Sequence, residues 1–310
     1  MTAPTFGAPA ATLERQGGKP LIRVAPGSDE VIPYDRASSF GKAIDSGAGL
    51  LYWAKCMVVA GVAKNPKLGQ AALGLDYDEP TGQDKKQLAS LAEDAMTVAQ
   101  SSNKRDMGSQ RHRLTELIDR GEALPDGLDD ETVADLDAYR RVTAGLTYPA
   151  IETFVVVDEV RVAGTFDRLI TVPDADPWPA WLRGRTCIGD LKTGNAEAAI
   201  AGIGIQLALY SRGSLYDIAT GERTPLQVDP NIGLVVHLPL GQGRAQVIAI
   251  DLNLGWQGVL AAQAAIAYQA AAKLGCKGCF EGSGFYKNGN PCRSCKGVPR
   301  VPFGVTVVAA

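Results

Sequence analysis

Two stretches encode the centre of the fold: ETFVVVDEVRVAGTFDRLITV, residues 152–172, and TCIGDLK, residues 186–192. Both are rich in β-branched and aromatic residues, which favour extended structure. The first predicts two strands joined by a turn near Asp158 and Glu159, and the second predicts a third, shorter strand. Asp190 and Lys192 are two residues apart on that third strand, so their side chains leave the same face.

Helical patterns surround these strands on both sides. The segments with helical spacing or composition are residues 38–62, interrupted by Gly47 and Gly49, then 85–120, 196–219 and 253–273. A hairpin is expected where NIGLVVHLPL and RAQVIAIDL are joined by Gly-Gln-Gly. This order predicts an α/β fold with a mixed central sheet flanked by helices.

Composition excludes several classes of protein. The 310 residues are 45% hydrophobic and 21% charged, which is typical of a soluble globular protein rather than a disordered or fibrous one. No apolar run approaches the ~18 residues of a bilayer span, and the first residues lack the order of a signal peptide. We therefore expect a cytoplasmic protein without membrane contact. The net charge of −3 argues against a polycation that coats nucleic acid.

Two segments are strongly biased in charge. Residues 122–137 hold seven acidic residues and no Lys or Arg, and we expect a solvated loop and helix face without a function. Residues 271–300 hold six basic residues against Glu281 alone, a net charge of +5. The predicted organisation is an irregular N-terminal arm (1–33), a main domain (34–273) with a helical part (34–150) and a core (151–273), a small knuckle (274–300) and a tail (301–310).

Four motifs follow one another along the chain, and together they can build a metal-dependent hydrolytic site. They are Gly108-x-x-x-His112, Gly164-Thr165-Phe166-Asp167, Asp190-Leu191-Lys192-Thr193-Gly194 and Gln206-x-x-x-Tyr210. Hairpin pairing can bring the carboxylate of Asp167 beside that of Asp190. Two such carboxylates repel unless a cation lies between them, and hard oxygen ligands suit Mg²⁺ or Mn²⁺. A metal held there polarises a phosphodiester oxygen and lowers the pKa of a bound water, while Lys192 orients that water or neutralises the phosphate.

The imidazole of His112 can add a nitrogen ligand, which favours Mn²⁺. Gln206 and Tyr210 are four residues apart and share a helix face. Each motif alone has an ordinary structural reading, such as a strand that ends at a turn, an exposed histidine or a surface ion pair of Asp167 with Arg168. The presence of all four motifs in one chain, in this order, favours a functional site over four separate structural features.

With these residues, GSQRH, AGTFDRL, IGDLKTG and QLALY, the chain resembles the RecB-type branch of the PD-(D/E)XK nucleases. That branch includes CRISPR-associated RecB-like nucleases and many phage exonucleases. The resemblance covers roughly residues 34–270. It implies a restriction-endonuclease-like fold, DNA as substrate, and, if the protein is phage-encoded, the host cytoplasm as its location.

The resemblance also implies a role for each matching residue. His112, Asp167, Asp190 and the backbone carbonyl of Leu191 would ligate the metal, and Lys192 would be the catalytic lysine. The expected accessory, DNA-contacting residues are Gln206, Tyr210 and Thr193. Glu152 lies where some relatives have a further acidic residue.

Four of the six cysteines form C-x2-C-x12-C-x2-C: Cys276, Cys279, Cys292 and Cys295. Two C-x-x-C turns can present four thiolates tetrahedrally to Zn²⁺ and so fold a segment too small for its own core. The motif is also similar to the zinc repeats of DnaJ-type chaperones. We expect a small C-terminal zinc knuckle, whose charge suits contact with the DNA backbone if it does more than cap the core.

Disulfides are one alternative to zinc, although nothing in the sequence suggests an oxidising compartment. An iron–sulfur cluster is the other, because RecB-type relatives often combine one early cysteine with three late ones. Cys56 would be the early ligand. Otherwise Cys56 and Cys187 are expected to be plain buried thiols.

The sequence thus predicts a metal-dependent DNA nuclease, more an exonuclease on DNA ends than an endonuclease, in phage replication or recombination. No Gly-x-x-x-x-Gly-Lys-Ser/Thr loop is present, so a helicase would have to be another chain, as would a recombination annealing protein. The alternatives are a non-catalytic DNA- or protein-binding module that keeps the fold, and a chaperone-like zinc adaptor.

Overall fold

The computed structural model describes residues 13–44, 47–99, 101–271 and 290. The chain divides into two compact units, Met1–Val259 and Leu260–Ala310. The architecture below is that of the first unit. Of the second unit, the structure describes the last part of one helix and residue 290.

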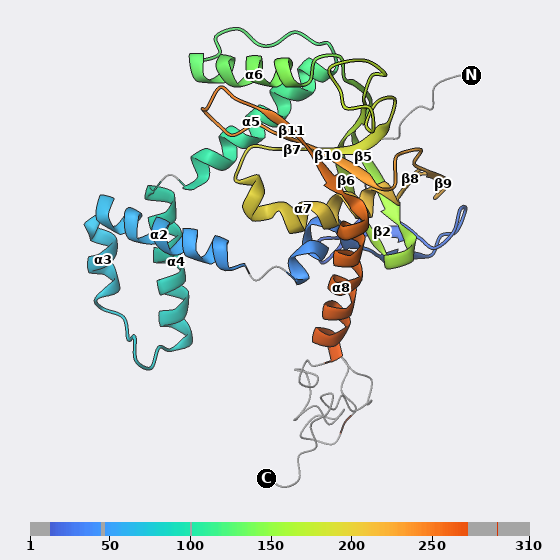
Figure 1. The fold of residues 1–310 in the computed structure, drawn as a ribbon. Coiled ribbons are helices and arrows are strands. Elements are labelled where there is room, and N and C mark those ends of the chain that lie inside the picture. The colour runs from blue at the N-terminus through green and yellow to red at the C-terminus, as the bar shows by residue number, and fades with distance from the viewer. Residues whose placement is uncertain (1–12, 45–46, 100, 272–289, 291–310) are drawn as a thin grey trace. The chain divides into compact units, whose positions relative to one another are not determined.

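A central mixed sheet organises the first unit (Figure 1). Its strands are β4 (Asp35–Arg36), β5 (Thr147–Val157), β6 (Val162–Thr171), β7 (Thr186–Lys192), β8 (Ser214–Tyr216), β9 (Arg223–Pro225), β10 (Ile232–His237) and β11 (Gln246–Asp251). The order is β11-β10-β7-β6-β5-β8-β9, with β4 pairing β6. The β7–β10 and β4–β6 pairs are parallel, and the others are antiparallel.

The described part of the chain also forms helices. They are α1 (Ala37–Phe40), α2 (Ala48–Lys64), α3 (Pro66–Ala72), α4 (Gly82–Val98), α5 (Ser101–Asp119), α6 (Asp130–Val142), α7 (Ala196–Ser211) and α8 (Leu252–Ala271). Of these, α5, α6 and α7 contact strands of this sheet, and α2, α3 and α4 pack mainly on one another. The expected helix over 38–62 is broken before Gly47, which has a φ of +64° that favours glycine. The helical stretch expected over 85–120 is two helices, α4 and α5.

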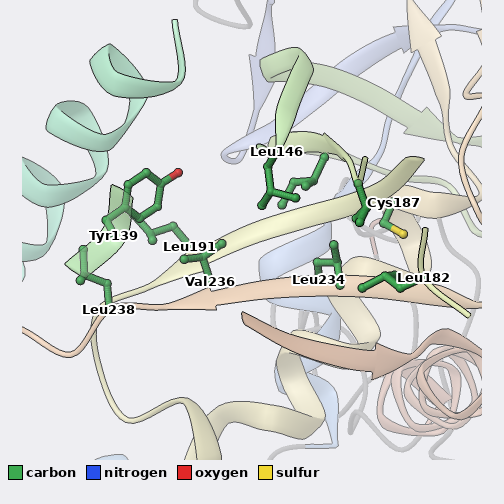
Figure 2. Close-up of a cluster of buried hydrophobic side chains, with 10 residues drawn as sticks. Tyr139, Leu146, Leu182, Cys187, Leu191, Leu234, Val236 and Leu238 are labelled. Atoms are coloured by element: carbon green, nitrogen blue, oxygen red, sulfur yellow. The ribbon is translucent and has the colours of Figure 1, made fainter. Parts of the chain in front are cut away.

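Helices cover both faces of the sheet, and β10 shows how. Leu234 and Val236 point into a buried cluster with Tyr139 of α6 and Leu191 of β7 (Figure 2). Gly233, which directly precedes Leu234, faces the other way, and a Cβ there would lie 3.1 Å from the side chain of Leu207 in α7. The predicted α/β class, with a mixed central sheet flanked by helices, is therefore confirmed.

The N-terminal arm is not irregular over its described part, and that expectation is wrong. Residues 15–33 form a second, antiparallel sheet of β1 (Arg15–Gln16), β2 (Lys19–Arg23) and β3 (Val31–Pro33). Ile22 is fully buried in a cluster that includes Phe154 of β5 and Tyr216 of β8. The burial of this apolar side chain attaches the arm to the sheet, a tertiary effect that local composition does not show.

Among the described residues, no single helix is both long and apolar enough to cross a bilayer. The pair Ala37–Ala43 and Ala48–Lys64 reaches that length only together, across a bend of 98°.

Candidate active site

The central sheet is split along one side of β6. Strand β5 pairs along one side of β6, so β4 and β7 must share the other. On that side β4 pairs only with Val162 and Ala163, and β7 pairs only from Arg168 onward. The stretch Gly164–Asp167 lies between the two, and the candidate site forms around it.

Asp167 and the strand β7 meet at this split. The backbone N–H of Leu191 donates to Asp167 Oδ2 over 3.0 Å. The neighbouring Asp190 is 3% exposed and interacts with Asp167, and its Oδ2 lies 2.6 Å from Lys192 Nζ. The sequence prediction that Asp167 and Asp190 come together, with Lys192 beside them, is therefore met by the geometry.

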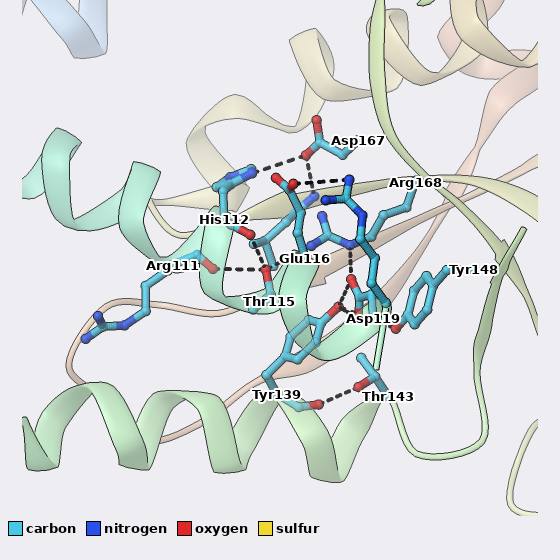
Figure 3. Close-up of polar contacts among 12 residues, drawn as sticks. Arg111, His112, Thr115, Glu116, Asp119, Tyr139, Thr143, Tyr148, Asp167 and Arg168 are labelled. Carbon is cyan, nitrogen blue, oxygen red and sulfur yellow. Dashed lines mark hydrogen bonds and ion pairs between the residues drawn. The ribbon is translucent and has the colours of Figure 1, made fainter. Parts of the chain in front are cut away.

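His112 joins the pair from helix α5. Its Nδ1 lies 3.6 Å from Asp167 Oδ2 (Figure 3). Burial, together with the positive charges of Arg168 and Lys192, lowers the pKa of His112, although Asp167 opposes the shift. The imidazole is therefore neutral near pH 7 and keeps a lone pair for a metal.

Helix α5 passes close to the end of β7 at Gly108, four residues before His112. A Cβ at Gly108 would lie 2.9 Å from Thr193 Oγ1, just beyond the end of β7. The missing side chain lets α5 approach the strand end closely enough to place His112, one helical turn later, against Asp167.

Replacing Gly108 with Ala is expected to lower activity by about tenfold, because the added methyl group crowds Thr193 Oγ1 and so displaces either that side chain or the helix that carries His112. The free energy of unfolding should change little, since Ala favours a helix by about 1 kcal/mol and offsets part of the crowding. Steady-state cleavage rates and urea denaturation of the two proteins measure both effects. Unchanged cleavage would show that this close approach does not position His112. The matched control is Gly74→Ala, since a Cβ at Gly74 meets no atom within 4 Å.

Two further acidic residues face the same place. Burial, together with the charges of Asp167 and Glu116, raises the pKa of Glu152 to about 7. Burial likewise raises the pKa of Glu116, which lies one turn after His112 on α5 (Figure 3). Burial and the charge of Asp167 raise the pKa of Asp190 well above its usual range, although Lys192 opposes the shift. Asp167 thus interacts with three further carboxyl groups at the split, those of Glu116, Glu152 and Asp190.

Glu152 also has an unusual backbone. Its φ is +48°, in the left-handed region that a residue with a long side chain rarely adopts. Such conformations persist where the surrounding structure imposes them, and they gather at functional sites. The charges of Asp167 and Glu116 act on the Glu152 carboxyl, so Glu152 belongs with them to one cluster, and we call Asp167, Asp190, Glu116 and Glu152 the acidic group.

A network of buried polar side chains connects the elements that carry the site (Figure 3). Arg168, next to Asp167 in β6, is fully buried and forms an ion pair with Asp119 of α5. Arg168 also donates to Thr115 Oγ1 over 2.8 Å, and Asp119 accepts from the hydroxyl of Tyr139 over 2.7 Å. This network joins α5, α6 and β6, so it fixes His112 relative to Asp167. The alternative of an exposed Asp167–Arg168 pair is wrong.

Gln206 and Tyr210 face β6 from α7. The Gln206 amide donates to the Tyr210 hydroxyl over 3.4 Å. A Cβ at Gly164 would lie 2.6 Å from that hydroxyl, so this strand position requires glycine. Burial, with the charges of Asp167 and Asp190, raises the pKa of Tyr210. The pair therefore lies beside the acidic group, as its place in the motif order predicts.

The donors present fit a hard divalent cation. Within the described residues, no three His, Cys, Asp or Glu side chains already converge as a complete metal site. The buried Oδ2 of Asp190, however, has no hydrogen bond of regular geometry from those residues; it lies 2.6 Å from the ammonium of Lys192, and the side chain faces the carboxylate of Asp167. An excess of carboxylates around such an oxygen is the donor set that Mg²⁺ or Mn²⁺ binds.

A groove of about 850 Å³ opens where β7 ends. It begins at Thr193 and is closed on another side by the β10–β11 turn; its lining is Trp53, Thr193, Gly194, Asn195, Glu197, His237, Pro239, Leu240, Gln242, Arg244, Ala245 and Gln246. Thr193, expected to contact DNA, thus joins the site to this groove.

Asp135 shapes one wall of the groove, and it corrects the expectation for residues 122–137. This carboxylate is fully buried, forms an ion pair with Arg111 at 3.0 Å and accepts from the N–H groups of Gly241 and Gly243. The acidic run is therefore not solvated throughout. Asp135 anchors the β10–β11 turn through these hydrogen bonds. Its partners are distant in the chain, and for that reason its burial could not be predicted from the local sequence.

Cys187 is buried, as expected, but Cys56 is exposed on α2, so the prediction of a buried thiol there is wrong. The motif cysteines Cys276, Cys279, Cys292 and Cys295 lie outside the described residues, and so does the expected knuckle.

The chain matches no known protein-family model, and no curated protein matches its sequence. The assignment of the candidate site therefore depends on the geometry of the residues described above. Sequence reasoning missed Glu116, although its spacing of four residues from His112 in a helix was a signal that the two share a face.

Proposed function

We propose that this protein is a metal-dependent deoxyribonuclease of the restriction-endonuclease-like, RecB-type kind, and that it acts as an exonuclease on DNA ends. The observation that carries the proposal is the meeting of Asp167, Asp190 and His112 beside Lys192 at the split in the sheet. These residues come from α5, β6 and β7, and their order in the chain is the one by which the sequence resembles that branch.

The residues of the site would have different roles in the reaction. Asp167, Asp190, His112 and the carbonyl of Leu191 would hold Mg²⁺ or Mn²⁺, with Glu152 and Glu116 adding negative charge nearby. The metal, when bound, supplies a Lewis acid that polarises the phosphodiester and lowers the pKa of a water.

Lys192 would place its ammonium against the non-bridging oxygens of the scissile phosphate, where negative charge develops during attack. Its ammonium lies 2.6 Å from Asp190 Oδ2, and its side chain is half-buried, which supports a place for Lys192 in the site. The neutral imidazole of His112 would remain a ligand rather than a proton donor. Tyr210, with its raised pKa, would remain a neutral hydrogen-bonding hydroxyl.

End-labelled linear DNA and covalently closed circular DNA, each with Mg²⁺, Mn²⁺ or EDTA, test this function. The expected result is metal-dependent loss of the linear form alone, with the label giving the polarity. Cleavage of circles would indicate an endonuclease. Binding of DNA without cleavage under any metal would favour a non-catalytic binding module.

We also propose that the four C-terminal cysteines bind one Zn²⁺. Replacing Cys276 and Cys279 with Ser should release one zinc per chain, because two thiolates cannot complete a tetrahedral site. Elemental analysis of the purified proteins measures this loss, with Cys187→Ser as the control. An unchanged zinc content would refute the site. An absorbance band near about 400 nm in anaerobically purified protein would instead indicate an iron–sulfur cluster.

A further inference from the structure

A second, smaller cavity opens at the same split in the sheet, toward β4. Its volume is about 240 Å³, below the ~300–1,000 Å³ of ordinary ligand pockets, so it accommodates a small group rather than a base pair. Its lining is Arg15, Pro20, Arg36, Ala37, Ser38, Phe154, Ala163, Gly164, Thr165, Gln206 and Tyr210. We call it the arginine pocket.

The polar groups of the arginine pocket are donors and cations. Arg15 and Arg36 bring two guanidinium groups, and no Asp or Glu belongs to the lining. Within the part of the chain that the structure describes, neither arginine forms an ion pair, and Arg15 donates only to the carbonyl of Gly18, over 3.4 Å. Ser38 and Thr165 add hydroxyl groups. Such a set matches the oxygens of a phosphate group.

The position of the arginine pocket relates it to the acidic group. Its floor on β6 is Gly164 and Thr165, two residues before Asp167, and two residues of a strand span ~7 Å. The hydroxyl of Tyr210 lies over Gly164, and the charges of Asp167 and Asp190 reach it. The pocket and the acidic group are therefore neighbours along the same strand, at a separation like that between adjacent phosphates of one nucleic-acid strand.

We infer that the arginine pocket binds a phosphate group of the DNA strand next to the phosphodiester that is cleaved, and so sets which bond enters the acidic group. This inference rests on the proposed nuclease function. Arg15 and Arg36 lie outside the motifs that carry the resemblance, on the N-terminal sheet and the strand β4 that leads from it. The N-terminal sheet would thereby be part of substrate binding.

The test measures binding separately from cleavage. All proteins carry Asp190→Asn, so that the strand stays intact, and the probe is a short fluorescein-labelled oligothymidylate with either a phosphate or a hydroxyl at its free end. Arg15→Gln combined with Arg36→Gln should weaken binding at least about tenfold, because charge-assisted contacts to phosphate are lost. The slope of log affinity against log salt should fall by about one.

The matched control is Arg140→Gln, an exposed arginine of α6 that pairs with Asp137. Binding by the double variant equal to that of the control would overturn the inference. A loss seen only with the terminal phosphate would assign the pocket to the strand end, and an equal loss with both probes would assign it to an internal phosphate. The proposed function is tested separately, with both arginines intact. If the Asp190→Asn protein does not bind the probe and the wild-type protein does not cleave DNA, the proposed function fails, and the inference fails with it.

Discussion

Asp190→Asn is expected to lower the rate of metal-dependent DNA cleavage by at least ~10³-fold. The amide keeps the shape of the side chain but removes the negative charge that faces Asp167 and Lys192. Without that charge the site loses a ligand for the cation and the partner that positions the catalytic ammonium. Initial rates on end-labelled linear DNA, over a range of Mn²⁺ concentrations, measure the effect.

The fold should survive this change. Asp190 is buried beside another carboxylate, so replacing it with a neutral group removes repulsion from the metal-free protein. Thermal unfolding in EDTA should therefore show no loss of stability. The matched control is Asp137→Asn, which neutralises an exposed carboxylate of α6. A variant that fails to fold would show that Asp190 serves the structure, and a variant that cleaves normally would remove it from the site.

Asp119→Ala is expected to destabilise the protein by about 3–5 kcal/mol, because it breaks a buried ion pair by removing one partner. The change leaves the buried guanidinium of Arg168 without its charge partner and deprives the Tyr139 hydroxyl of its acceptor. Both side chains of the ion pair are at most 1% exposed, so water cannot replace the lost partner. Urea denaturation measures the change in the free energy of unfolding.

The control for this variant is Asp137→Ala, which breaks the exposed ion pair with Arg140 and should cost no more than about 1 kcal/mol. Equal losses in the two variants would contradict the assignment of Asp119 to a buried supporting network. Activity gives a second readout: Arg168 follows Asp167 directly, so the Asp119 variant should also lose cleavage at temperatures where it remains folded.

The sequence predicted the parts of the site that lie on regular strands. The Val-rich stretch before Asp167 and the short strand that ends at Lys192 have an alternation that determines which side chains share a face. The pairing of β6 with β7 then follows from their adjacency in the chain. Asp167, Asp190 and Lys192 could therefore be placed together before any coordinates.

The parts that sequence reasoning missed depend on partners that are distant in the chain. Asp135 belongs to an acidic run that looks solvated, and only Arg111 and the β10–β11 turn make its burial favourable. The N-terminal sheet was expected to be irregular because residues 1–33 are rich in Pro, Gly and Ala, whereas in the structure Ile22 packs against residues of β5 and β8. Glu116 was the exception, since the helical spacing from His112 was available.

The central claim is that the carboxylates at the split form a divalent-cation site, and Mn²⁺ binding tests it most directly, without any need for the right DNA substrate. Titration calorimetry or electron paramagnetic resonance should show Mn²⁺ bound by the wild-type protein and at least about tenfold weaker binding by Asp190→Asn, with Asp137→Asn unchanged. Equal Mn²⁺ affinity in the wild type and the Asp190 variant, or no binding by either, would contradict the claim.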